Sequence, residues 1–234
     1  MTKAPSIILV RPQMGENIGA AARAMANFGL RDLRLVAPRD GWPNPKASDT
    51  AGKALAIVDD ATTYENVSAA FADCQFVLAT TARSRAMNLP VMEVRAAMVD
   101  LRMRTARGEK CAVMFGPERT GLENEDMALA NAVVTIPVAP DYTSLNIGQA
   151  VVVTAYEWFM STPAEGGEGQ PAAPRGELAG LLGQLEEALD DKNFWRVPEK
   201  KEVMWRNIRG TLVRAGLTEQ EIATWRGMVK SLTA

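Results

Sequence analysis

The first two thirds of the chain alternate short apolar runs with longer segments of helical periodicity. The apolar runs cover residues 6–10, 33–36, 75–80, 111–115 and 132–138. They are short, largely continuous and bounded by turn residues, which is typical of strands buried on both faces of a parallel sheet. Helical segments are expected at residues 17–29, 92–107, 123–130 and 147–160. This alternation predicts an α/β domain with a mostly parallel sheet flanked by helices.

The first long helix has recognisable ends. Asn17 fits its N-cap, and Gly29 fits the C′ position that follows its last residue. Gly19 and Arg23 are four residues apart and therefore share one helix face. After a loop rich in Pro, Gly, Asn and Asp, the pattern is weaker. There we expect a short helix near residues 48–55, a weak strand near 56–59 and a helix over 64–71.

Four of the loops that follow predicted strands carry polar residues or glycines. They begin after Val10, Thr80, Phe115 and Ile136. Ligands of parallel sheets bind beyond the carboxyl ends of the strands. We therefore expect these loops to enclose one pocket.

The turn over residues 143–146, Thr-Ser-Leu-Asn, leads from the last strand into the helix 147–160. The free N–H groups and the dipole of a helix N-terminus suit such a turn to a ligand. Ser144 and Asn146 can equally cap the helix, which is the usual role of these residue types. The residues alone leave both interpretations open.

The last third of the chain has a different composition. Residues 161–174 contain no large apolar residue and are typical of a flexible linker. Residues 175–234 carry three apolar stripes at helical spacing, which predicts a small helical extension. We therefore divide the chain into a domain over residues 1–160, this linker and the extension. The tryptophans expected to be core residues of the extension, and not base-stacking platforms, are Trp195, Trp205 and Trp225.

Composition restricts the chemistry. The chain has 234 residues, of which 47% are hydrophobic and 23% charged, and its formal net charge is −2. It has no histidine, which excludes Ser-His-Asp hydrolases, Cys-His proteases and nearly all His-ligated zinc sites, so we expect no metal. Cys74 and Cys111 lie beside apolar runs and are interpreted as buried thiols of a reducing compartment. Since no apolar stretch could span a bilayer and no signal peptide is evident, we expect a cytoplasmic protein without a membrane partner.

The net charge conceals a local excess of basic residues between positions 83 and 110. The basic residues are Arg83, Arg85, Arg95, Arg102, Arg104, Arg107 and Lys110, against Glu93, Asp100 and Glu109. If two copies of the chain associate, two such faces could meet in one basic groove.

Three motifs occur in order at the predicted strand-to-helix loops. They are Asn17-x-Gly19-x-x-x-Arg23, then Phe115-Gly116-x-Glu118-x-x-Gly121, then Ser144-Leu145-Asn146 followed by Ala150 and Tyr156-Glu157. Together, over about residues 6–160, they resemble the motifs of the SpoU branch of the SPOUT RNA methyltransferases. The loop 80–85, with an Asn-Phe-Trp turn and an Asn-Ile-Arg helix in the tail, is similar to the tRNA-modifying members of this branch.

The resemblance implies an α/β fold with a deep C-terminal trefoil knot, a homodimer and S-adenosylmethionine as cofactor. The reaction it implies is 2′-O-methylation of tRNA ribose at the pyrimidine of position 32, in the anticodon loop. The alternative target is another tRNA or rRNA site. The residues implied to bind the cofactor are Thr80, Thr81, Ala82, Gly116, Ile136, Thr143, Ser144 and Leu145.

The resemblance also implies roles for individual side chains. The implied catalytic residues are Arg23, Asn17, Glu118, Ser144 and Asn146. A guanidinium is too basic to accept the hydroxyl proton, so we interpret Arg23 as an anchor for the phosphate beside the target ribose. Glu118 is expected to hold Arg23 or a neighbouring loop by a charge-assisted bond. The residues expected to contact RNA are Arg23, Arg83, Arg85 and Arg119.

Simpler interpretations exist for each residue taken alone. Arg23 would be a solvated helix residue, Asn17 a cap and Glu118 a surface acid, while Asn146 would bond loop backbone. Two other function classes stay open: an RNA-binding module of the same fold without catalysis, and an α/β enzyme with a nucleotide cofactor. The second is disfavoured because the chain has neither a Gly-x-Gly-x-x-Gly turn nor a Walker A loop.

Overall fold

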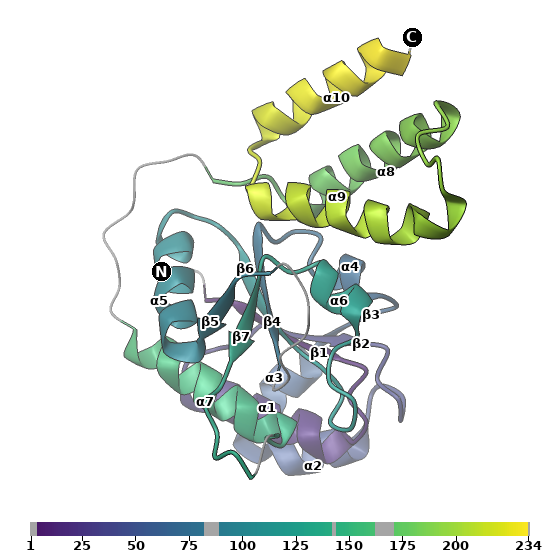
Figure 1. Cartoon of the computed structure of the whole chain (residues 1–234). Coiled ribbons are helices and arrows are strands. Elements are labelled where there is room, and N and C mark those ends of the chain that lie inside the picture. Colours follow the sequence, from purple (N-terminus) through teal and green to yellow (C-terminus); the bar gives the residue numbers. More distant parts are fainter. Residues whose placement is uncertain (1–3, 82–88, 142–143, 162–170, 234) are drawn as a thin grey trace.

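In the computed structural model, the described residues 4–81, 89–141, 144–161 and 171–233 form a helix-covered sheet with a helical extension above it (Figure 1). Within these residues the sheet has seven strands, all parallel, in the order β3-β2-β1-β6-β4-β7-β5. They are β1 (Ser6–Val10), β2 (Leu33–Val36), β3 (Thr62–Tyr64), β4 (Phe76–Thr80), β5 (Val91–Glu93), β6 (Cys111–Phe115) and β7 (Ala132–Thr135). The predicted α/β fold with a parallel sheet is confirmed.

Helices cover both faces of the sheet. The helices of this domain are α1 (Gly15–Asn27), α2 (Pro45–Ala51), η1 (Gly52–Ala54), α3 (Leu55–Asp59), α4 (Val67–Ala70), α5 (Val94–Ala106), α6 (Asn124–Ala128) and α7 (Ile147–Met160). Ile7 and Leu9 of β1 share a core with α1, α5 and α7, whereas Ile8 and Val10 share one with α4 and α6. Alternate residues of one strand thus serve two cores, which explains why this strand is apolar throughout.

The region between β2 and β4 differs from the prediction. The short helix near residues 48–55 is present as α2 and η1, but the strand expected over 56–59 is wrong, since these residues lie in α3. Ile57 and Val58 are both buried there. A short apolar run fits a strand or one helical turn equally well, so periodicity could not decide. The edge strand β3 follows instead, and the helix expected over 64–71 is reduced to α4.

Strand β5 was not predicted. It occupies the start of the helix expected over residues 92–107, so that α5 begins at Val94. β5 pairs with β7 at the sheet edge, with Met92 opposite Val134. Val91 is 67% exposed, so this three-residue strand lacks the apolar run that marked the others.

Helix α1 begins two residues earlier than predicted. Asn17 lies inside its first turn, Met14 occupies the N-cap, and the expectation that Asn17 is the cap is therefore wrong. Gly29 has φ +76°, as a C′ glycine requires. A Cβ at Gly19 would lie 2.4 Å from the carbonyl oxygen of Ala47, so this glycine lets α1 and α2 approach closely.

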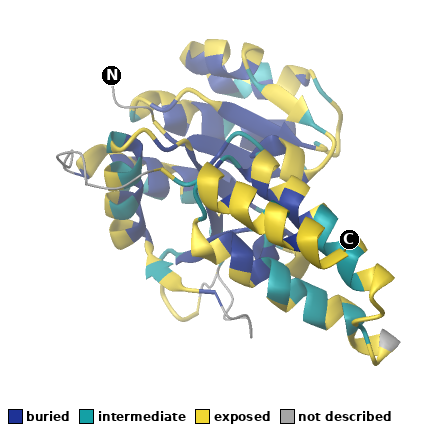
Figure 2. Cartoon of the chain, turned by 90° about the horizontal axis from the view of Figure 1, so that it is seen from above, coloured by how far each residue is buried: buried dark blue, intermediate teal, exposed yellow. Residues whose placement is uncertain are grey.

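The extension consists of α8 (Arg175–Asp191), η2 (Pro198–Lys200), α9 (Lys201–Ala215) and α10 (Glu219–Thr233). It has an apolar cluster of its own, which includes Leu181, Leu212 and Ile222, and its outer surfaces are exposed (Figure 2). Trp205 packs against this cluster, whereas Trp225 is 37% exposed and is not a core residue. None of the described helices is long and apolar enough to cross a membrane.

Backbone hydrogen bonds attach the extension to the sheet domain. The Arg175 N–H donates to the Cys74 carbonyl at 2.9 Å, and the Gly176 N–H donates to the Ala72 carbonyl at 2.7 Å. Asn131, just before β7, donates its side-chain amide to the Val213 carbonyl at 3.2 Å. The extension is thus fixed above the segments that precede β4 and β7 (Figure 1).

Both cysteines are buried, as predicted. Burial raises the pKa of the Cys74 thiol to about 12, and it also raises the pKa of Cys111. A thiol is reactive only as the thiolate, so neither cysteine is suited to act as a nucleophile.

Candidate active site

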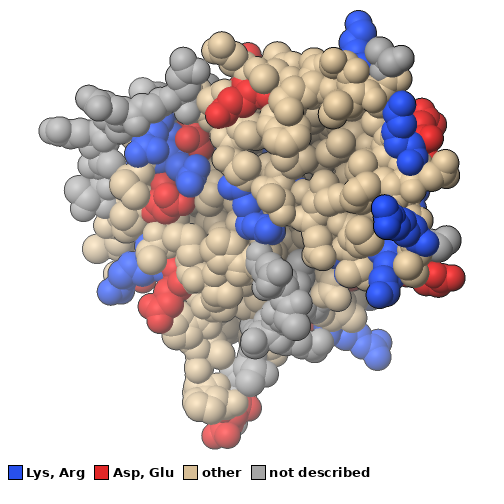
Figure 3. Space-filling model, turned by 45° about the horizontal axis from the view of Figure 1, so that its top comes forward, with Lys and Arg blue, Asp and Glu red and all other residues tan. Residues whose placement is uncertain are grey.

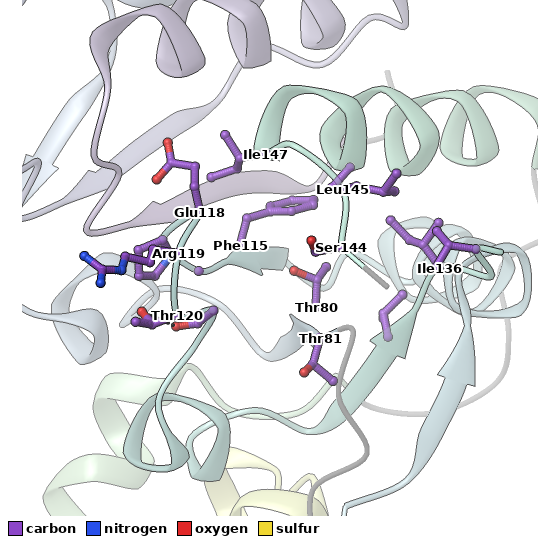
Figure 4. A pocket seen from close by; sticks show the side chains of 16 residues that line it. Thr80, Thr81, Phe115, Glu118, Arg119, Thr120, Ile136, Ser144, Leu145 and Ile147 are labelled. Atoms are coloured by element: carbon purple, nitrogen blue, oxygen red, sulfur yellow. Dashed lines mark hydrogen bonds between the residues drawn. The ribbon is translucent and has the colours of Figure 1, made fainter. Parts of the chain in front are cut away.

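A pocket opens where β4, β6 and β7 end at the carboxyl edge of the sheet (Figure 4). Its volume is about 220 Å³. Strand ends, the loop 116–121 and the turn before α7 form its walls, as the topology of a parallel sheet predicts. The residues named from the sequence that line it are Thr80, Thr81, Gly116, Glu118, Arg119, Ile136, Ser144 and Leu145.

Hydrogen bonds connect β4 to β6 and to β7 at the floor of the pocket. The Thr80 hydroxyl donates to the Met114 carbonyl of β6 at 2.9 Å. The Thr81 N–H donates to the Val134 carbonyl of β7 at 3.0 Å. The Thr80 oxygen keeps lone pairs that can accept a bond from a ligand. The end of β4 is therefore rigid and still offers polar groups to the pocket.

The loop after β6 folds tightly onto itself. A Cβ on Gly116 would lie 2.2 Å from the Leu122 nitrogen and 2.4 Å from the Gly121 carbonyl carbon, so position 116 has no room for a side chain. Gly121 has φ +69° and donates its N–H to the Pro117 carbonyl at 2.8 Å. Backbone packing explains both glycines of this motif. In Figure 4, the Arg119 side chain of the same loop points away from Thr80 and Ser144.

Asn146 is the N-cap of α7. Its Oδ1 accepts a hydrogen bond from the Gly148 N–H at 2.8 Å, and its own N–H donates to Gln149 Oε1 at 3.2 Å. This reciprocal arrangement satisfies free N–H groups of the helix end. The cap leaves the Nδ2 amino group of Asn146 available for a second partner. Ser144, two residues earlier, is exposed and lines the pocket.

The second partner of Asn146 completes a chain of hydrogen bonds. Asn146 Nδ2 donates to Asn17 Oδ1 at 2.9 Å, and Asn17 Nδ2 donates to Glu118 Oε1 at 2.5 Å. Glu118 Oε2 accepts from the Gln13 N–H at 3.1 Å. Of the two partners expected for Glu118, Arg23 or a neighbouring loop, the structure shows the loop. The chain joins the three motifs, which are far apart in sequence, at one wall of the pocket.

Close packing of α1 against α7 permits this connection. A Cβ on Gly148 would lie 2.9 Å from the Cβ of Ala20, so the first turn of α7 lies directly on α1. The two helices remain side by side along their length (Figure 1). Asn17 and Asn146 meet because glycine occupies position 148.

Comparisons with known proteins identify the family of this chain. A sequence model of the SpoU rRNA Methylase family matches residues 4–156. The chain belongs to the SpoU methylase family. Among curated proteins it is similar to the tRNA (cytidine/uridine-2′-O-)-methyltransferase TrmJ of Cronobacter sakazakii (strain ATCC BAA-894). The identity is 34% over 234 residues, covering 97% of this chain and 94% of that protein.

Solved structures of similar sequence share the fold. The crystal structure of TrmJ from Z. mobilis ZM4 is 43% identical, with a TM-score of 0.91, and the match covers 99% of this chain and 100% of that chain. A structure described as giving insights into the 2-OH methylation of C/U34 on tRNA is 29% identical, with a TM-score of 0.53. That match covers 66% of this chain and 93% of that chain.

Arg23 of the first SpoU motif is exposed and does not line the pocket of its own chain. It forms no hydrogen bond or ion pair with any of the described residues. Three residues earlier, Ala20 lies against α7, and five residues later, just past the end of α1, the Phe28 ring lies 5.8 Å from the ring of Tyr156 and 6.0 Å from that of Phe159. Arg23 therefore lies beside the middle of α7, on the outside of the domain.

Most of the basic excess on α5 serves packing. Arg95 bonds Glu157 at 3.1 Å, Arg102 lies 3.5 Å over the Trp158 ring, and Arg104 bonds Asp100 at 2.9 Å. Arg102 and Arg104 are thus engaged in packing, whereas the Arg95 side chain is 78% exposed and its ion pair with Glu157 is a surface pair. Figure 3 shows Lys and Arg interspersed with Asp and Glu on the side that carries the extension. Four residues named from the sequence lie outside the described residues: Ala82, Arg83, Arg85 and Thr143.

Sequence reasoning missed part of the pocket lining. The additional lining residues are Pro117, Thr120, Val134, Val138 and Ile147, together with Phe115, Gly121 and Ala150, which belong to the motifs but were given no place in the pocket. Phe115 and Val134 lie at or near the ends of the predicted strands, and Ile147 and Ala150 belong to the first turn of the predicted helix. The rule that ligands sit beyond strand ends could therefore have named these four. The backbone N–H of Gln13 carries no sequence signal and could not have been found.

Proposed function

We propose that this protein transfers a methyl group from S-adenosylmethionine to the 2′-hydroxyl of a cytidine or uridine ribose in tRNA. Its TrmJ relatives bear this activity in their name and match almost the whole chain. The observation that carries the proposal is the chain of hydrogen bonds from Glu118 through Asn17 to Asn146. It holds the three SpoU motifs together beside a pocket at the strand ends, where such a reaction needs preorganised walls.

The chemistry of the pocket lining fits S-adenosylmethionine. Ile136, Val138 and Leu145 offer apolar side chains, and threonine and serine hydroxyls with loop backbone offer polar groups. When bound, the cofactor supplies an electrophilic methyl group on a sulfonium. We assign its contacts to Thr80, Thr81, Gly116, Ile136, Ser144 and Leu145, with Ala82 and Thr143 from the segments beyond the described residues.

The protein's own groups would position the acceptor. Asn17 and Asn146 hold the turn that bears Ser144 against the loop that bears Glu118, so the pocket wall does not need to form during the reaction. Arg23 would anchor the phosphate beside the target ribose through its two-pronged guanidinium. The hydroxyl proton would leave through this anchored phosphate, because a guanidinium does not accept it.

We also propose that two copies associate through α1 and α7. Val152, Tyr156 and Phe159 are 42%, 45% and 61% exposed and lie on the outer side of α7. Phe28, the residue that directly follows α1, packs against the last two. A contiguous exposed apolar patch of this kind marks a protein interface. Arg23 lies beside the patch, so association would bring it to the interface, where it could serve the partner subunit's pocket.

The trefoil knot and the division into domains belong to the same proposal. β7 lies between β4 and β5 although it follows both in sequence, which is the arrangement expected if the chain threads past the β4–β5 connection. Residues 82–88 and 142–143 of this path lie outside the described residues. The separate apolar cluster of the extension supports a domain over residues 1–160, a linker over 161–174 and an extension over 175–234.

For the target we propose the pyrimidine at position 32. Position 34 is the second candidate, because the chain also resembles the structure that concerns C/U34. That match covers 66% of this chain, whereas the match to TrmJ from Z. mobilis covers 99% and so includes the extension. An extension shared with TrmJ favours position 32.

The test is transfer of labelled methyl from S-adenosylmethionine to unmethylated tRNA, followed by mass-spectrometric mapping of ribose methylation. We expect 2′-O-methylcytidine or 2′-O-methyluridine at position 32, and strongly reduced transfer by Arg23→Ala and Asn146→Ala. Methylation at position 34 would replace the proposed target. Cofactor binding without any transfer would indicate an RNA-binding module, and absence of cofactor binding by calorimetry would overturn the function.

A further inference from the structure

Arg11, the residue after β1, has an unusual backbone. Its φ is +47°, in the left-handed region that non-glycine residues rarely adopt. Its N–H continues the sheet ladder by donating to the Val36 carbonyl at 2.8 Å. Such a conformation persists only where surrounding contacts hold it, and it often occurs near functional sites. The contacts of the Arg11 side chain therefore matter.

The Arg11 guanidinium is paired with α6. Nη2 donates to Asp126 Oδ2, Nη1 lies 3.4 Å from Asp126 Oδ1, and Nη2 lies 3.7 Å from Glu123 Oε2. The Asp126 side chain is 8% exposed and that of Arg11 34%, so water screens this pair less than a surface pair. Two-pronged arginine–carboxylate contacts also fix direction. Arg11 thus holds the first turn of α6 in one orientation.

Asp126 connects this ion pair to the pocket loop. Its Oδ2 also accepts a hydrogen bond from the Glu123 N–H at 3.0 Å, and Glu123 is the N-cap of α6. Glu123 directly follows Leu122, which is 1% exposed and ends the loop that lines the pocket. The segment after β1 therefore holds this loop at two points. Arg11 holds its end through Asp126, and the Gln13 N–H holds its middle through Glu118.

We propose that Arg11 is a positioning residue, which clamps the loop 116–122 through Asp126 and so preforms the pocket for S-adenosylmethionine. The inference rests on the proposed function for the identity of the ligand. Arg11 itself does not line the pocket. Ala37 follows β2 with φ +42°, so this backbone conformation does not require a side-chain ion pair; at position 11 it directs the guanidinium from the end of β1 onto α6.

Three variants separate this role from a general contribution to stability. Arg11→Gly removes the ion pair with Asp126, which lowers stability, but it also relieves the backbone strain at position 11, which raises stability. The two effects therefore oppose each other. Arg11→Lys keeps one charged contact with Asp126. Ala37→Gly is the matched control, because Ala37 follows the neighbouring strand β2 with φ +42° and is exposed. It relieves the same kind of strain away from α6.

The experiment combines calorimetry with S-adenosylmethionine and amide hydrogen exchange of the ligand-free protein. We expect Arg11→Gly to weaken cofactor binding on the order of fivefold, a common size for coupling between sites. Exchange at Gly121 and Leu122 should become faster while β1 stays protected. Arg11→Lys should restore part of both effects, and Ala37→Gly should change neither.

Unchanged exchange at Gly121 and Leu122 in Arg11→Gly would overturn the clamp. Faster exchange there without loss of cofactor affinity would overturn the role of the clamp in preforming the pocket. A wild-type protein that binds no S-adenosylmethionine would overturn the proposed function instead. The exchange data would then decide by themselves whether Arg11 clamps the loop.

Discussion

Asn17 and Asn146 lie 129 residues apart in sequence, and the Nδ2 amino group of Asn146 donates a hydrogen bond of 2.9 Å to Asn17 Oδ1. The oxygen of Asn146 is occupied by the helix cap, and the amino group of Asn17 by Glu118. In each side-chain amide the oxygen accepts one hydrogen bond and the amino group donates another, to a different partner. A carboxylate could replace only the accepting half of either residue.

Asn146→Asp should separate capping from the connection to Asn17. Aspartate caps a helix as well as asparagine does, so the free energy of unfolding should fall only by the lost hydrogen bond to Asn17, about 1 kcal/mol. Methyl transfer should fall on the order of 100-fold, because the carboxylate cannot donate to Asn17 and the two motifs separate. Asn146→Ala should lose activity and, because it also loses the cap, about a further 1 kcal/mol of stability. Transfer kinetics and thermal unfolding measure both, and wild-type turnover by Asn146→Asp would show that the connection is dispensable.

Mixing two inactive variants should restore activity if Arg23 serves the partner subunit's pocket. In a mixed dimer of Arg23→Ala and Asn146→Ala, one pocket has its own Asn146 and receives Arg23 from the other subunit. Random exchange of equal amounts gives half mixed dimers with one intact site each, so activity should reach about a quarter of wild type. Methyl transfer before and after subunit exchange measures this. If Arg23 acts within its own chain, the mixture stays inactive.

Phe159→Glu should disrupt the association through α1 and α7. Phe159 is 61% exposed in one chain, so a charge there does not disturb folding but would be buried in the dimer without a partner. Light scattering should show a monomer with an unchanged circular dichroism spectrum and little methyl transfer. Leu232→Glu is the control, since Leu232 is 76% exposed on α10, away from the patch. A dimer that tolerates Phe159→Glu would place the interface elsewhere.

Asp73 should make stability depend on pH in the acid range. Hydrogen bonds from the Arg34 guanidinium, at 2.5 and 3.1 Å, hold the pKa of Asp73 well below its ordinary value of 3.8. A lowered pKa contributes stability above the pKa of the unfolded state and loses it as pH falls further. The wild type should therefore exceed Asp73→Asn by about 1 kcal/mol at pH 7, a modest gap because the carboxylate is 41% exposed. Urea unfolding should show the gap closing below about pH 4, and a gap that widens there would contradict the assignment.

tRNA affinity should fall steeply with salt although the net charge is −2. Binding that neutralises phosphates releases counterions, so the logarithm of the affinity decreases linearly with the logarithm of salt concentration. Arg119→Ala should reduce this slope by about one, as the loss of a single phosphate contact does. Filter binding from low to moderate salt measures both slopes. A flat response would exclude a phosphate-binding groove built by the dimer.

The strands that could be predicted are those buried on both faces. β1, β4 and β6 have uninterrupted apolar runs, and their residues are almost completely buried. β3 and β5 are three-residue edge strands with exposed positions, and such strands carry no run that distinguishes them from loops or helix starts. The order of the strands, in which β7 lies between β4 and β5, is determined by long-range packing and has no local signal in the sequence.

The candidate site was predictable as a set of loops and not as a set of contacts. Glycines and polar residues after strands indicated the pocket, and the motifs named Asn17, Glu118 and Asn146. That Asn17 bonds Glu118 from inside α1, instead of capping the helix, follows from where the helix begins. The N-cap lies three residues before the expected one, which exceeds the one or two residues by which assigned helix starts differ, because Met14 has none of the side-chain types that mark a cap.

The contact between Gly148 and Ala20 places a constraint on anyone who would re-engineer this enzyme for other methyl donors. Residues such as Thr120 and Val138 can be varied to reshape the cavity, since they face it directly. A side chain at position 148 would instead push α1 and α7 apart, because its Cβ would lie 2.9 Å from the Ala20 methyl group. A library that leaves this glycine fixed keeps the scaffold intact while the specificity evolves.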